Sequence, residues 1–185
     1  LDVLDGSHMA GDVGVKWQAV YEKMVLGEMP PEEESRPEPA AQKRVLKEIA
    51  EDMKQPSPMR RLLQGDVGSG KTIVALEAAI IAIENGYQAA LMAPTEILAT
   101  QHYLSARRML EKAGYRIVLL TGSVEAVRKR DIRRHIAQGN AQLVIGTHAL
   151  IEEKVEFGNL GLVIVDEQHR FGVMQRLKLM KKALA

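Results

Sequence analysis

The sequence contains no cysteine and few aromatic residues. Without cysteine, the chain can form no disulfide framework, no thiolate metal site and no cysteine nucleophile, which is typical of a protein from a reducing compartment. Aromatics supply only 4% of the residues although 46% are hydrophobic, so the core must consist mainly of Ala, Val, Ile, Leu and the nine Met. This composition suits helices packed on a parallel sheet.

Long apolar runs are also missing. The most apolar stretch, residues 73–83, is shorter than the roughly 18 to 20 residues that a membrane-spanning helix needs. We therefore expect a soluble, cytoplasmic chain with no membrane partner. Its 185 residues are enough for one domain with a hydrophobic core and an appendage.

The net charge of +1 hides an asymmetry along the chain. Residues 1–40 contain nine acidic and three basic side chains, whereas residues 41–185 contain 15 acidic and 22 basic ones. The later part is therefore basic. This charge permits binding to a phosphate backbone, but it is equally common in domains that bind no nucleic acid.

The first 39 residues are expected to lie outside the main domain. Residues 1–10 include Gly6-Ser7-His8-Met9, which is typical of a remnant left by cloning and tag cleavage. Within residues 11–39, apolar side chains at helical spacing predict an amphipathic helix over 16–28. Residues 29–39 contain four prolines and four glutamates and predict a linker.

From residue 40 onward, helical and strand-like patterns alternate. Strands are predicted at 61–64, 89–93, 117–120, 143–145 and 162–165, and helices at 41–54, 71–84, 96–112 and 124–137. This alternation predicts an α/β fold, a mostly parallel sheet with helices on both faces. In such sheets, ligands bind at the carboxyl ends of the strands.

A glycine-rich loop separates the first predicted strand from its helix. The loop matches the P-loop pattern G-x-x-x-x-G-K-[ST] without a gap, in the strand-loop-helix context that this pattern requires. Its backbone N–H groups and the helix macrodipole would attract a triphosphate. The predicted ATP-binding residues of this loop are Gly65, Asp66, Val67, Gly68, Ser69, Gly70, Lys71 and Thr72.

Four side chains are expected to carry the chemistry. Lys71 would bridge the terminal phosphates, and the Thr72 hydroxyl would ligate Mg²⁺. The apolar run 162–165 ends in two acids, of which Asp166 would hold Mg²⁺ through water and Glu167 would position and deprotonate the attacking water. This pairing indicates a hydrolase. The sequence contains no Asn-Lys-x-Asp motif, which argues against a GTPase switch.

Asp166-Glu167-Gln168-His169 forms a D-E-x-H box, the hallmark of superfamily 2 helicases and translocases. Longer runs resemble one family in particular, the RecG branched-DNA helicases. These runs occupy residues 58–72, 93–103, 121–123, 146–151 and 166–176, and the resemblance covers roughly residues 40–180. Transcription-repair coupling translocases share the D-E-x-H-R-F-G-V block, and a non-motor P-loop switch module is a second alternative.

The resemblance implies an ATP-dependent DNA helicase that uses Mg²⁺ and remodels stalled forks and Holliday junctions in recombination and repair, at the nucleoid of a bacterial cytoplasm. Residues 40–185 would be its first RecA-like motor domain, in incomplete form. The intact enzyme would add a second RecA-like domain with an arginine finger and a wedge domain that engages branched DNA. Alone, the chain is expected to hydrolyse little ATP and to separate no strands.

Further roles follow from the same resemblance. Gln42 would read the adenine edge. His169 would couple the nucleotide site to the DNA side, or would only pair with a neighbouring acid. Groups just past the strand ends would contact a DNA backbone, unless individual hydroxyls cap helices. These DNA candidates are Pro94, Thr95, Thr121, Gly122, Ser123, Gly146, Thr147 and His148.

Two groups of basic residues remain without an assigned role. The arginines and the lysine in residues 128–134 either contact DNA or form a solvated helix face. His102, His135 and His148 have no partner at ligand spacing, so none of them is predicted to bind a metal ion.

Overall fold

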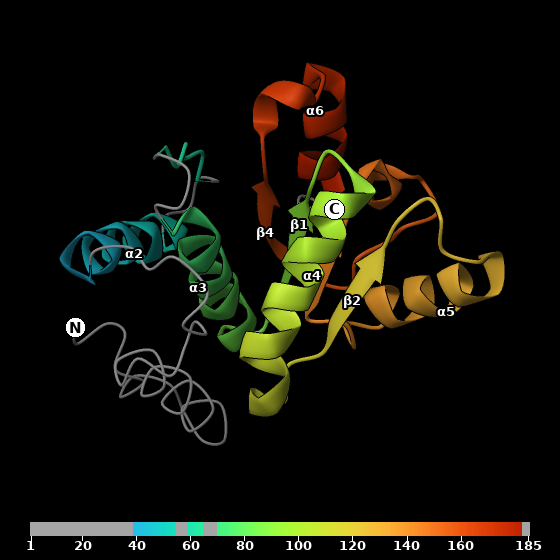
Figure 1. Cartoon of the computed structure of the whole chain (residues 1–185), viewed down its shortest axis with the longest axis horizontal. Coiled ribbons are helices and arrows are strands. Elements are labelled where there is room, and N and C mark those ends of the chain that lie inside the picture. The colour runs from blue at the N-terminus through green and yellow to red at the C-terminus, as the bar shows by residue number, and fades with distance from the viewer. Residues whose placement is uncertain (1–38, 55–58, 65–69, 183–185) are drawn as a thin grey trace. The chain divides into compact units, whose positions relative to one another are not determined.

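The computed structural model describes residues 39–54, 59–64 and 70–182 (Figure 1). These residues belong to two compact units, residues 1–84 and residues 85–185. The amphipathic helix predicted over residues 16–28 lies outside the described residues, as do the cloning remnant and the linker except for its last residue.

The described part of the first unit consists of two packed helices and a segment between them. Helix α2 spans Pro39–Met53 and helix α3 spans Lys71–Glu84. Leu46, Ile49 and Ala50 are buried and lie on one face of α2. Pro39 was predicted as the last linker residue, but it begins α2, because the first helical position needs no backbone N–H.

The strand predicted at residues 61–64 is wrong, since the described part of the first unit contains no strand. Arg61 instead pairs with two acids of α2: its Nη1 lies 2.8 Å from Oε2 of Glu48, and its Nη2 lies 2.6 Å from Oδ2 of Asp52. Leu62 is 58% exposed. The segment therefore contacts a helix through charged side chains and buries too little apolar surface to behave as a core strand.

The second unit is built on a parallel four-stranded sheet with the order β2-β3-β1-β4. Its strands, each predicted to within two residues, are β1 (Gln88–Met92), β2 (Ile117–Leu120), β3 (Leu143–Gly146) and β4 (Leu160–Val165). Because all of them run in the same direction, their carboxyl ends meet at one edge of the sheet. The loops that leave this edge therefore contain the residues of greatest functional interest.

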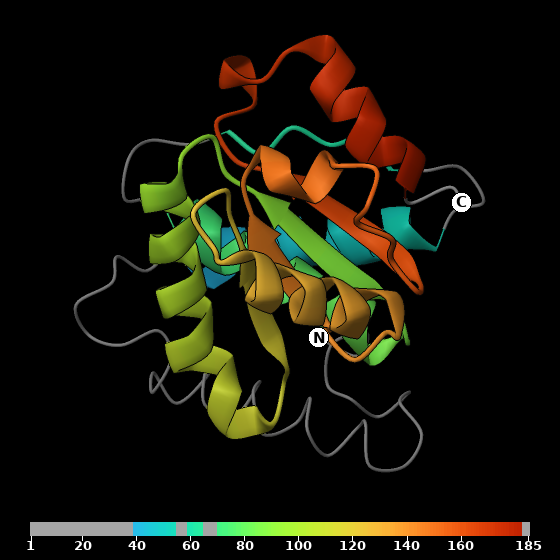
Figure 2. The ribbon, with the colours of Figure 1, turned by 90° about the vertical axis from the view of Figure 1, so that its right-hand side faces the viewer.

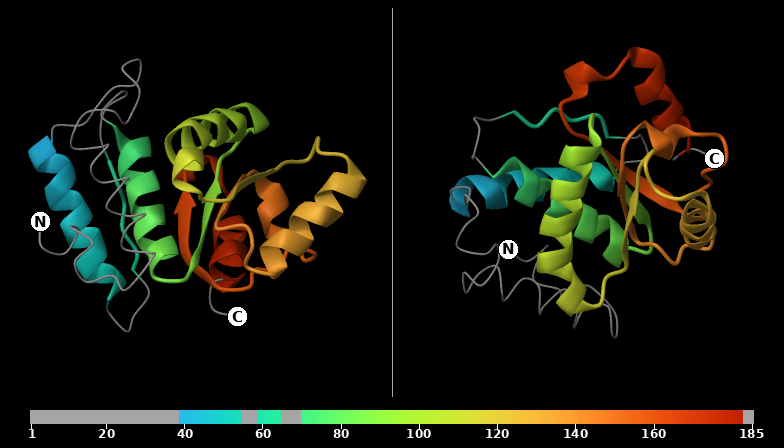
Figure 3. Two further views of the ribbon diagram at one scale, coloured as in Figure 1. Left: turned by 90° about the horizontal axis from the view of Figure 1, so that it is seen from below. Right: turned by 45° about the vertical axis from the view of Figure 1, so that its right-hand side comes forward.

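Helices cover both faces of this sheet. In the left view of Figure 3, α4 lies on one side of the strands and α6 on the other, and Figure 2 shows α5 in front of the strands. The helices are α4 (Glu96–Leu110), α5 (Ala126–Ala137) and α6 (Val173–Lys182), with short 3-10 turns η1 (Glu111–Ala113), η2 (His148–Ile151) and η3 (Gln168–Arg170). Within the described ranges, every helix is too short or too polar to cross a membrane.

Side-chain alternation along the strands divides the core between the two faces. Met92, Leu120 and Val144 point to one face and share a buried cluster with Ile136 of α5 and Leu179 of α6. Helices α5 and α6 are thus held mainly by aliphatic contacts, with Phe171 in the same cluster and Phe157 packed against it. The predicted parallel sheet with helices on both faces is confirmed.

The amino-terminal end of the sheet is held by one buried amide. Gln88 is 3% exposed, and its Nε2 donates to the carbonyl oxygens of Ile136 at 3.0 Å and Ala141 at 2.6 Å. Its Oε1 accepts from the backbone N–H of Asn159 at 3.0 Å. This one side chain therefore hydrogen-bonds to backbone groups of α5 and of the segments that precede β3 and β4. Burying such polar groups without a partner would cost free energy.

At the carboxyl end, helix α4 is fixed by its first residues. The Thr95 hydroxyl caps the helix by accepting from the N–H of Leu98 at 3.2 Å. The next residue, Glu96, accepts from the N–H of Ser123 at 3.0 Å and so ties α4 to the loop that follows β2. Hydrogen bonding from Ser123 lowers the pKa of the Glu96 carboxyl, and nearby His148 acts in the same direction.

We predict that Gln88→Leu destabilises the chain by roughly 2–4 kcal/mol, because the Ala141 carbonyl oxygen and the Asn159 N–H lose their bonds to this buried side chain and the Ile136 carbonyl oxygen loses one of its donors. Urea unfolding followed by circular dichroism measures the change. Gln101→Leu, on an exposed position of α4, is the matched control and should change stability by less than about 0.5 kcal/mol. Equal stability of the two variants would contradict the structural role of Gln88.

We predict that the chemical shift of the Ser123 amide proton changes with pH as Glu96 titrates, with a midpoint below 4.5, the ordinary pKa of a glutamate. The folded-state pKa of Glu96 is lowered, so its hydrogen bond to the loop is present above this range and is lost as the pH falls through the lowered value. An NMR titration tests this. Glu96→Gln should abolish the transition and Glu125→Gln should keep it; a transition that survives in Glu96→Gln would show that another group is responsible.

Candidate functional site

The acidic motif lies directly at the end of β4. Val165 pairs with Met92 of β1, and the N–H of the next residue, Asp166, donates to the Met92 carbonyl oxygen at 2.9 Å. The ladder therefore continues one residue past the strand and sets the backbone position of Asp166. Since β1 and β4 are parallel neighbours, this carboxylate lies at the same edge as the amino terminus of α4.

Both oxygens of the Asp166 carboxylate accept a hydrogen bond. Nε2 of His102, on α4, lies 2.8 Å from Oδ2, and the backbone N–H of Glu167 donates to Oδ1 at 2.9 Å. Because a carboxylate oxygen has two lone pairs, each oxygen can accept a further bond, for example from a metal-bound water. The carboxylate is thus oriented, and it stays partly open to solvent.

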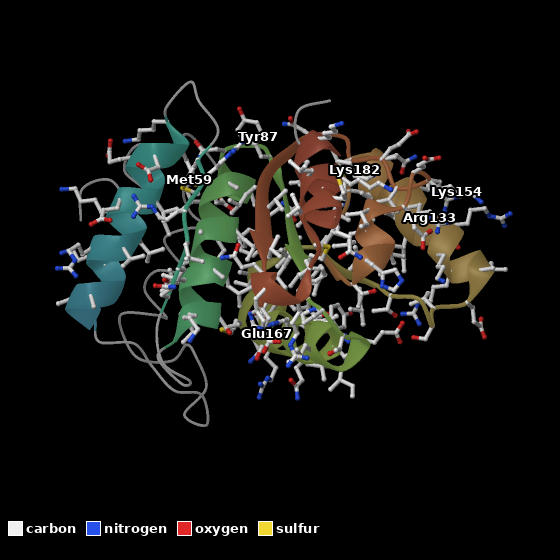
Figure 4. All side chains as sticks on the ribbon, turned by 90° about the horizontal axis from the view of Figure 1, so that it is seen from above. Met59, Tyr87, Arg133, Lys154, Glu167 and Lys182 are labelled. Atoms are coloured by element: carbon white, nitrogen blue, oxygen red, sulfur yellow. The ribbon has the colours of Figure 1, made fainter. Side chains whose placement is uncertain are left out.

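Glu167 has a strained backbone. Its φ of 44° and ψ of 51° place it in the left-handed region. Among the described residues other than glycine, it alone has a positive φ. A left-handed residue of this kind costs roughly 1–2 kcal/mol. Oε2 of Glu167 lies 2.8 Å from Nε of Arg170 but accepts no aligned hydrogen bond among the described residues. Figure 4 shows Glu167 at the end of β4.

A histidine outside the D-E-x-H box contacts the first acid of that box. His169 is exposed in η3, and the histidine that contacts Asp166 is His102. The contact joins residues that are 64 positions apart, so local sequence patterns could not reveal it. The helix pattern held a weaker signal. His102 lies seven residues, or about two turns, after the helix cap Thr95, so the two residues lie on the same helix face and His102 could be expected to face the same side as the strand ends.

The structure describes the P-loop only from Gly70 onward. Gly65 to Ser69 lie outside the described residues, as does the side chain of Gln42 in the first turn of α2. Gly70 has a φ of 78°, and its carbonyl oxygen accepts from the N–H of Ile73 at 3.0 Å. Lys71 and Thr72 are the first two residues of α3, which agrees with the predicted helix start.

No cluster of three or more metal-ligating side chains occurs among the described residues. Magnesium bound together with a nucleotide does not need one, because it retains several waters and takes one or two carboxylates along with phosphate oxygens. Asp166, with its oriented carboxylate, supplies a donor of the required kind, and so does the Thr72 hydroxyl. Within its own unit, each of these oxygen donors is of the kind that Mg²⁺ prefers.

The predicted DNA contacts divide by exposure. Thr95, Gly122, Ser123 and His148 are exposed in the loops after β1, β2 and β3, and Pro94 is half-buried. The other three candidates are buried: Thr121 is 3% exposed, Thr147 is 1% exposed, and Gly146 packs closely on β2.

The buried candidates serve the packing of these loops. A Cβ atom on Gly146 would lie 2.1 Å from the Leu120 carbonyl oxygen, so only glycine allows this approach. The Thr121 hydroxyl lies 3.1 Å from that of Ser123. The Thr147 hydroxyl is buried and has no partner among the described residues. In this conformation, their side chains are not available to a phosphate backbone.

Several members of the basic run on α5 have local partners. Nη2 of Arg133 lies 2.6 Å from Oε2 of Glu152, and Nη2 of Arg134 lies 3.2 Å from Oδ1 of Asp131. Nζ of Lys129 donates to the Gly122 carbonyl oxygen at 2.6 Å. The sequence left two interpretations of this run open, DNA contact and a solvated helix face, and the ion pairs favour the solvated face. Lys129 is the exception, because it bonds to the loop after β2.

Arg133 also takes part in anchoring the turn that follows η2. Lys182 at the end of α6 donates from Nζ to the carbonyl oxygens of Glu152, at 2.9 Å, and Val155. Burial lowers the pKa of the Lys182 ammonium. Figure 4 shows Arg133 and Lys182 on their separate helices. These contacts stabilise the unit away from the carboxyl edge.

Comparison with known proteins identifies the family. The model of the family described as "DEAD/DEAH box helicase" matches residues 39–185. The ATP-dependent DNA helicase RecG of Aquifex aeolicus is 56% identical over 142 residues, which are 77% of this chain and 18% of that protein. RecG of Bacillus subtilis is also 56% identical over 142 residues, 77% of this chain and 21% of that protein.

A solved structure, described as RecG bound to a three-way DNA junction, matches with a TM-score of 0.72 and 45% identity, over 83% of this chain and 20% of that one. The chain thus spans about a fifth of the length of these relatives. The resemblance to the RecG helicases that the motifs indicated is confirmed, as is the RecA-like α/β fold. The chain belongs to the DEAD/DEAH box helicase family.

Proposed function

We propose that this chain is the ATP-binding first motor domain of a superfamily 2 DNA helicase that remodels branched DNA, such as stalled forks and Holliday junctions, in recombination and repair. The observation that carries the proposal is the similarity to RecG proteins over more than three quarters of the chain. The helicase family model, which matches residues 39–185, includes the acidic motif at the end of β4. The similar relatives are bacterial, which favours action in the cytoplasm at the nucleoid.

In the proposed nucleotide site, residues 65–72 wrap the triphosphate with backbone N–H groups, and Lys71 contacts its terminal phosphates. Thr72 and Asp166 would each offer an oxygen ligand to Mg²⁺, which when bound would neutralise phosphate charge. Gln42 reads the adenine edge. The two hydrogen bonds on the Asp166 carboxylate support its role, because they fix the group in one orientation.

Glu167 positions the attacking water and accepts its proton. Its Oε2 forms an ion pair with Nε of Arg170 at 2.8 Å, which holds the carboxylate beside Asp166 and leaves Oε1 as the oxygen to receive the proton. The strained backbone of Glu167 is a further indication, because such conformations are concentrated at functional sites. His169, exposed beside these acids, couples the site to the DNA side.

The proposed DNA surface is formed by the exposed residues at the carboxyl edge, Thr95, Gly122, Ser123 and His148. They can contact phosphates from either strand without reading base sequence. Lys129 adds a positive charge next to Gly122. Pro94 and the buried Thr121, Gly146 and Thr147 contribute by shaping the loops that present the exposed residues.

The intact protein would add a second RecA-like domain and a wedge domain. This part of the proposal is supported by the length of the RecG relatives, of which the chain spans about a fifth. A motor of this class needs an arginine finger from its second domain to stabilise charge on the transferring phosphoryl group. We therefore propose that this chain binds Mg·ATP but hydrolyses little of it.

We predict that Lys71→Ala weakens binding of a non-hydrolysable ATP analogue at least about tenfold, because a charge-assisted contact to the terminal phosphates is lost. Isothermal titration calorimetry measures the affinity, and Lys112→Ala, an exposed lysine in η1, is the matched control. ATP turnover by the unchanged chain should equal that of Lys71→Ala, with or without a synthetic DNA fork.

Two results would contradict the proposal in different ways. Equal nucleotide affinity of the unchanged chain and Lys71→Ala would refute the nucleotide site. Fork-stimulated turnover that Lys71→Ala abolishes would show that the chain completes its own active site, for example by forming a dimer, and the half-motor proposal would be wrong.

A further inference from the structure

We propose that His102 is a positioning residue for the metal-binding carboxylate: its hydrogen bond from α4 holds Asp166 in the orientation that receives magnesium with its nucleotide. This inference rests on the proposed function, since it concerns the metal site of that function. It assigns a role to a histidine that the sequence motifs left without one.

The contact between His102 and Asp166 is well suited to this role. Nε2 of His102 lies 2.8 Å from Oδ2 of Asp166, and the histidine side chain is 14% exposed. An ionised aspartate only accepts hydrogen bonds, so His102 must donate from Nε2. Shielding from water strengthens such a bond and reduces the number of competing partners.

A second hydrogen bond, from the N–H of Glu167, further restricts the orientation of the Asp166 carboxylate. The N–H of Glu167 occupies Oδ1 of Asp166 while His102 occupies Oδ2, so the carboxylate plane is fixed at both of its oxygens. Without His102, Oδ2 of Asp166 loses this donor, and the side chain is less restrained against rotation about its terminal torsion. A metal ion held through this one carboxylate is sensitive to that rotation, because octahedral Mg²⁺ tolerates little change in geometry.

The place of His102 on α4 is itself fixed. Ala99 and Ala106 stand three residues before and four residues after His102, so all three lie on the same helix face. Both alanines are fully buried, which shows that this face packs against the sheet, and their small side chains allow α4 to approach it closely. The bond between Glu96 and Ser123 anchors the same helix one and a half turns earlier.

A purely structural role would predict something different. If His102 only fastened α4 to the end of β4, its replacement would lower the stability of the chain and leave the affinity for metal unchanged. If it orients Asp166, its replacement weakens metal binding, and a side chain that restores the donor restores the affinity. Partners that orient metal ligands in this way are typically worth 10- to 100-fold in metal affinity.

The test is direct measurement of Mn²⁺ bound with ADP by electron paramagnetic resonance, since Mn²⁺ accepts the same carboxylate and water ligands as Mg²⁺. His102→Leu, which removes the donor, should weaken Mn²⁺ binding roughly tenfold. His102→Gln, whose Nε2 can reach the same oxygen, should restore it. His135→Leu makes the same change on an exposed position of α5 and should bind as the unchanged chain does.

Asp166→Asn separates failure of this inference from failure of the proposed function. If Asp166→Asn weakens Mn²⁺ binding and His102→Leu does not, His102 has no positioning role and the proposed metal site still holds. If His102→Gln binds as weakly as His102→Leu, the hydrogen bond is not the cause, and the inference is wrong. If the unchanged chain binds no Mn²⁺ with ADP, both the metal site and the inference fail. Urea unfolding of each variant confirms that the folded chain is being compared.

Discussion

Parallel pairing of the four strands is the constraint on which the rest of the second unit depends. Because β1 pairs in the same direction with both β3 and β4, and β3 with β2, every strand ends at one edge of the sheet. Residues that are far apart in the sequence are therefore brought together there, including Thr95, Ser123 and Asp166. Helix α4, which starts at this edge, is then held at two points, through Glu96 to the loop after β2 and through His102 to the end of β4.

The two ends of the sheet are built differently. At the amino end, the buried amide of Gln88 satisfies three backbone groups. At the carboxyl end, Glu167 has a left-handed backbone and the buried hydroxyl of Thr147 lacks a partner in the described part of the chain. Strain and unsatisfied groups are tolerated only where the surrounding structure is over-determined, and they are concentrated at functional sites. Gln88 therefore stabilises one end of the sheet, and the proposed function places the chemistry at the other.

Sequence patterns predicted the elements well where the pattern and the burial agree. The runs at 89–93 and 143–145 are short and apolar, and the strands found there, β1 and β3, are fully buried. Residues 61–64 had a similar appearance, but Arg61 pairs with acids of α2, and a pattern of four residues carries no information about such partners. The amino-acid pattern of so short a segment therefore predicts neither its burial nor its neighbours.

The candidate site was predicted in its positions and less well in its contacts. The strand-end rule correctly gathered Thr95, Thr121 and Thr147 at one edge, because that follows from parallel topology alone. The exposure of each threonine depends on how side chains from different loops pack together. The residues next to it in the sequence do not reveal this packing. The bond between His102 and Asp166 was missed for the same reason, since it spans 64 residues and exists only after the sheet has formed.

Under the proposed function, the loops at the carboxyl edge of the sheet contact DNA, and Asp166 at this edge contacts the metal ion of the bound nucleotide. Backbone NMR of the chain with Mg·ADP and then with a short three-way DNA junction tests it most directly. We predict that the nucleotide shifts the amides of Lys71, Thr72 and Asp166, and that DNA then shifts those of Gly122, Ser123 and His148. Shifts that are concentrated instead around Gln88 and Asn159, at the opposite end of the sheet, would contradict the account.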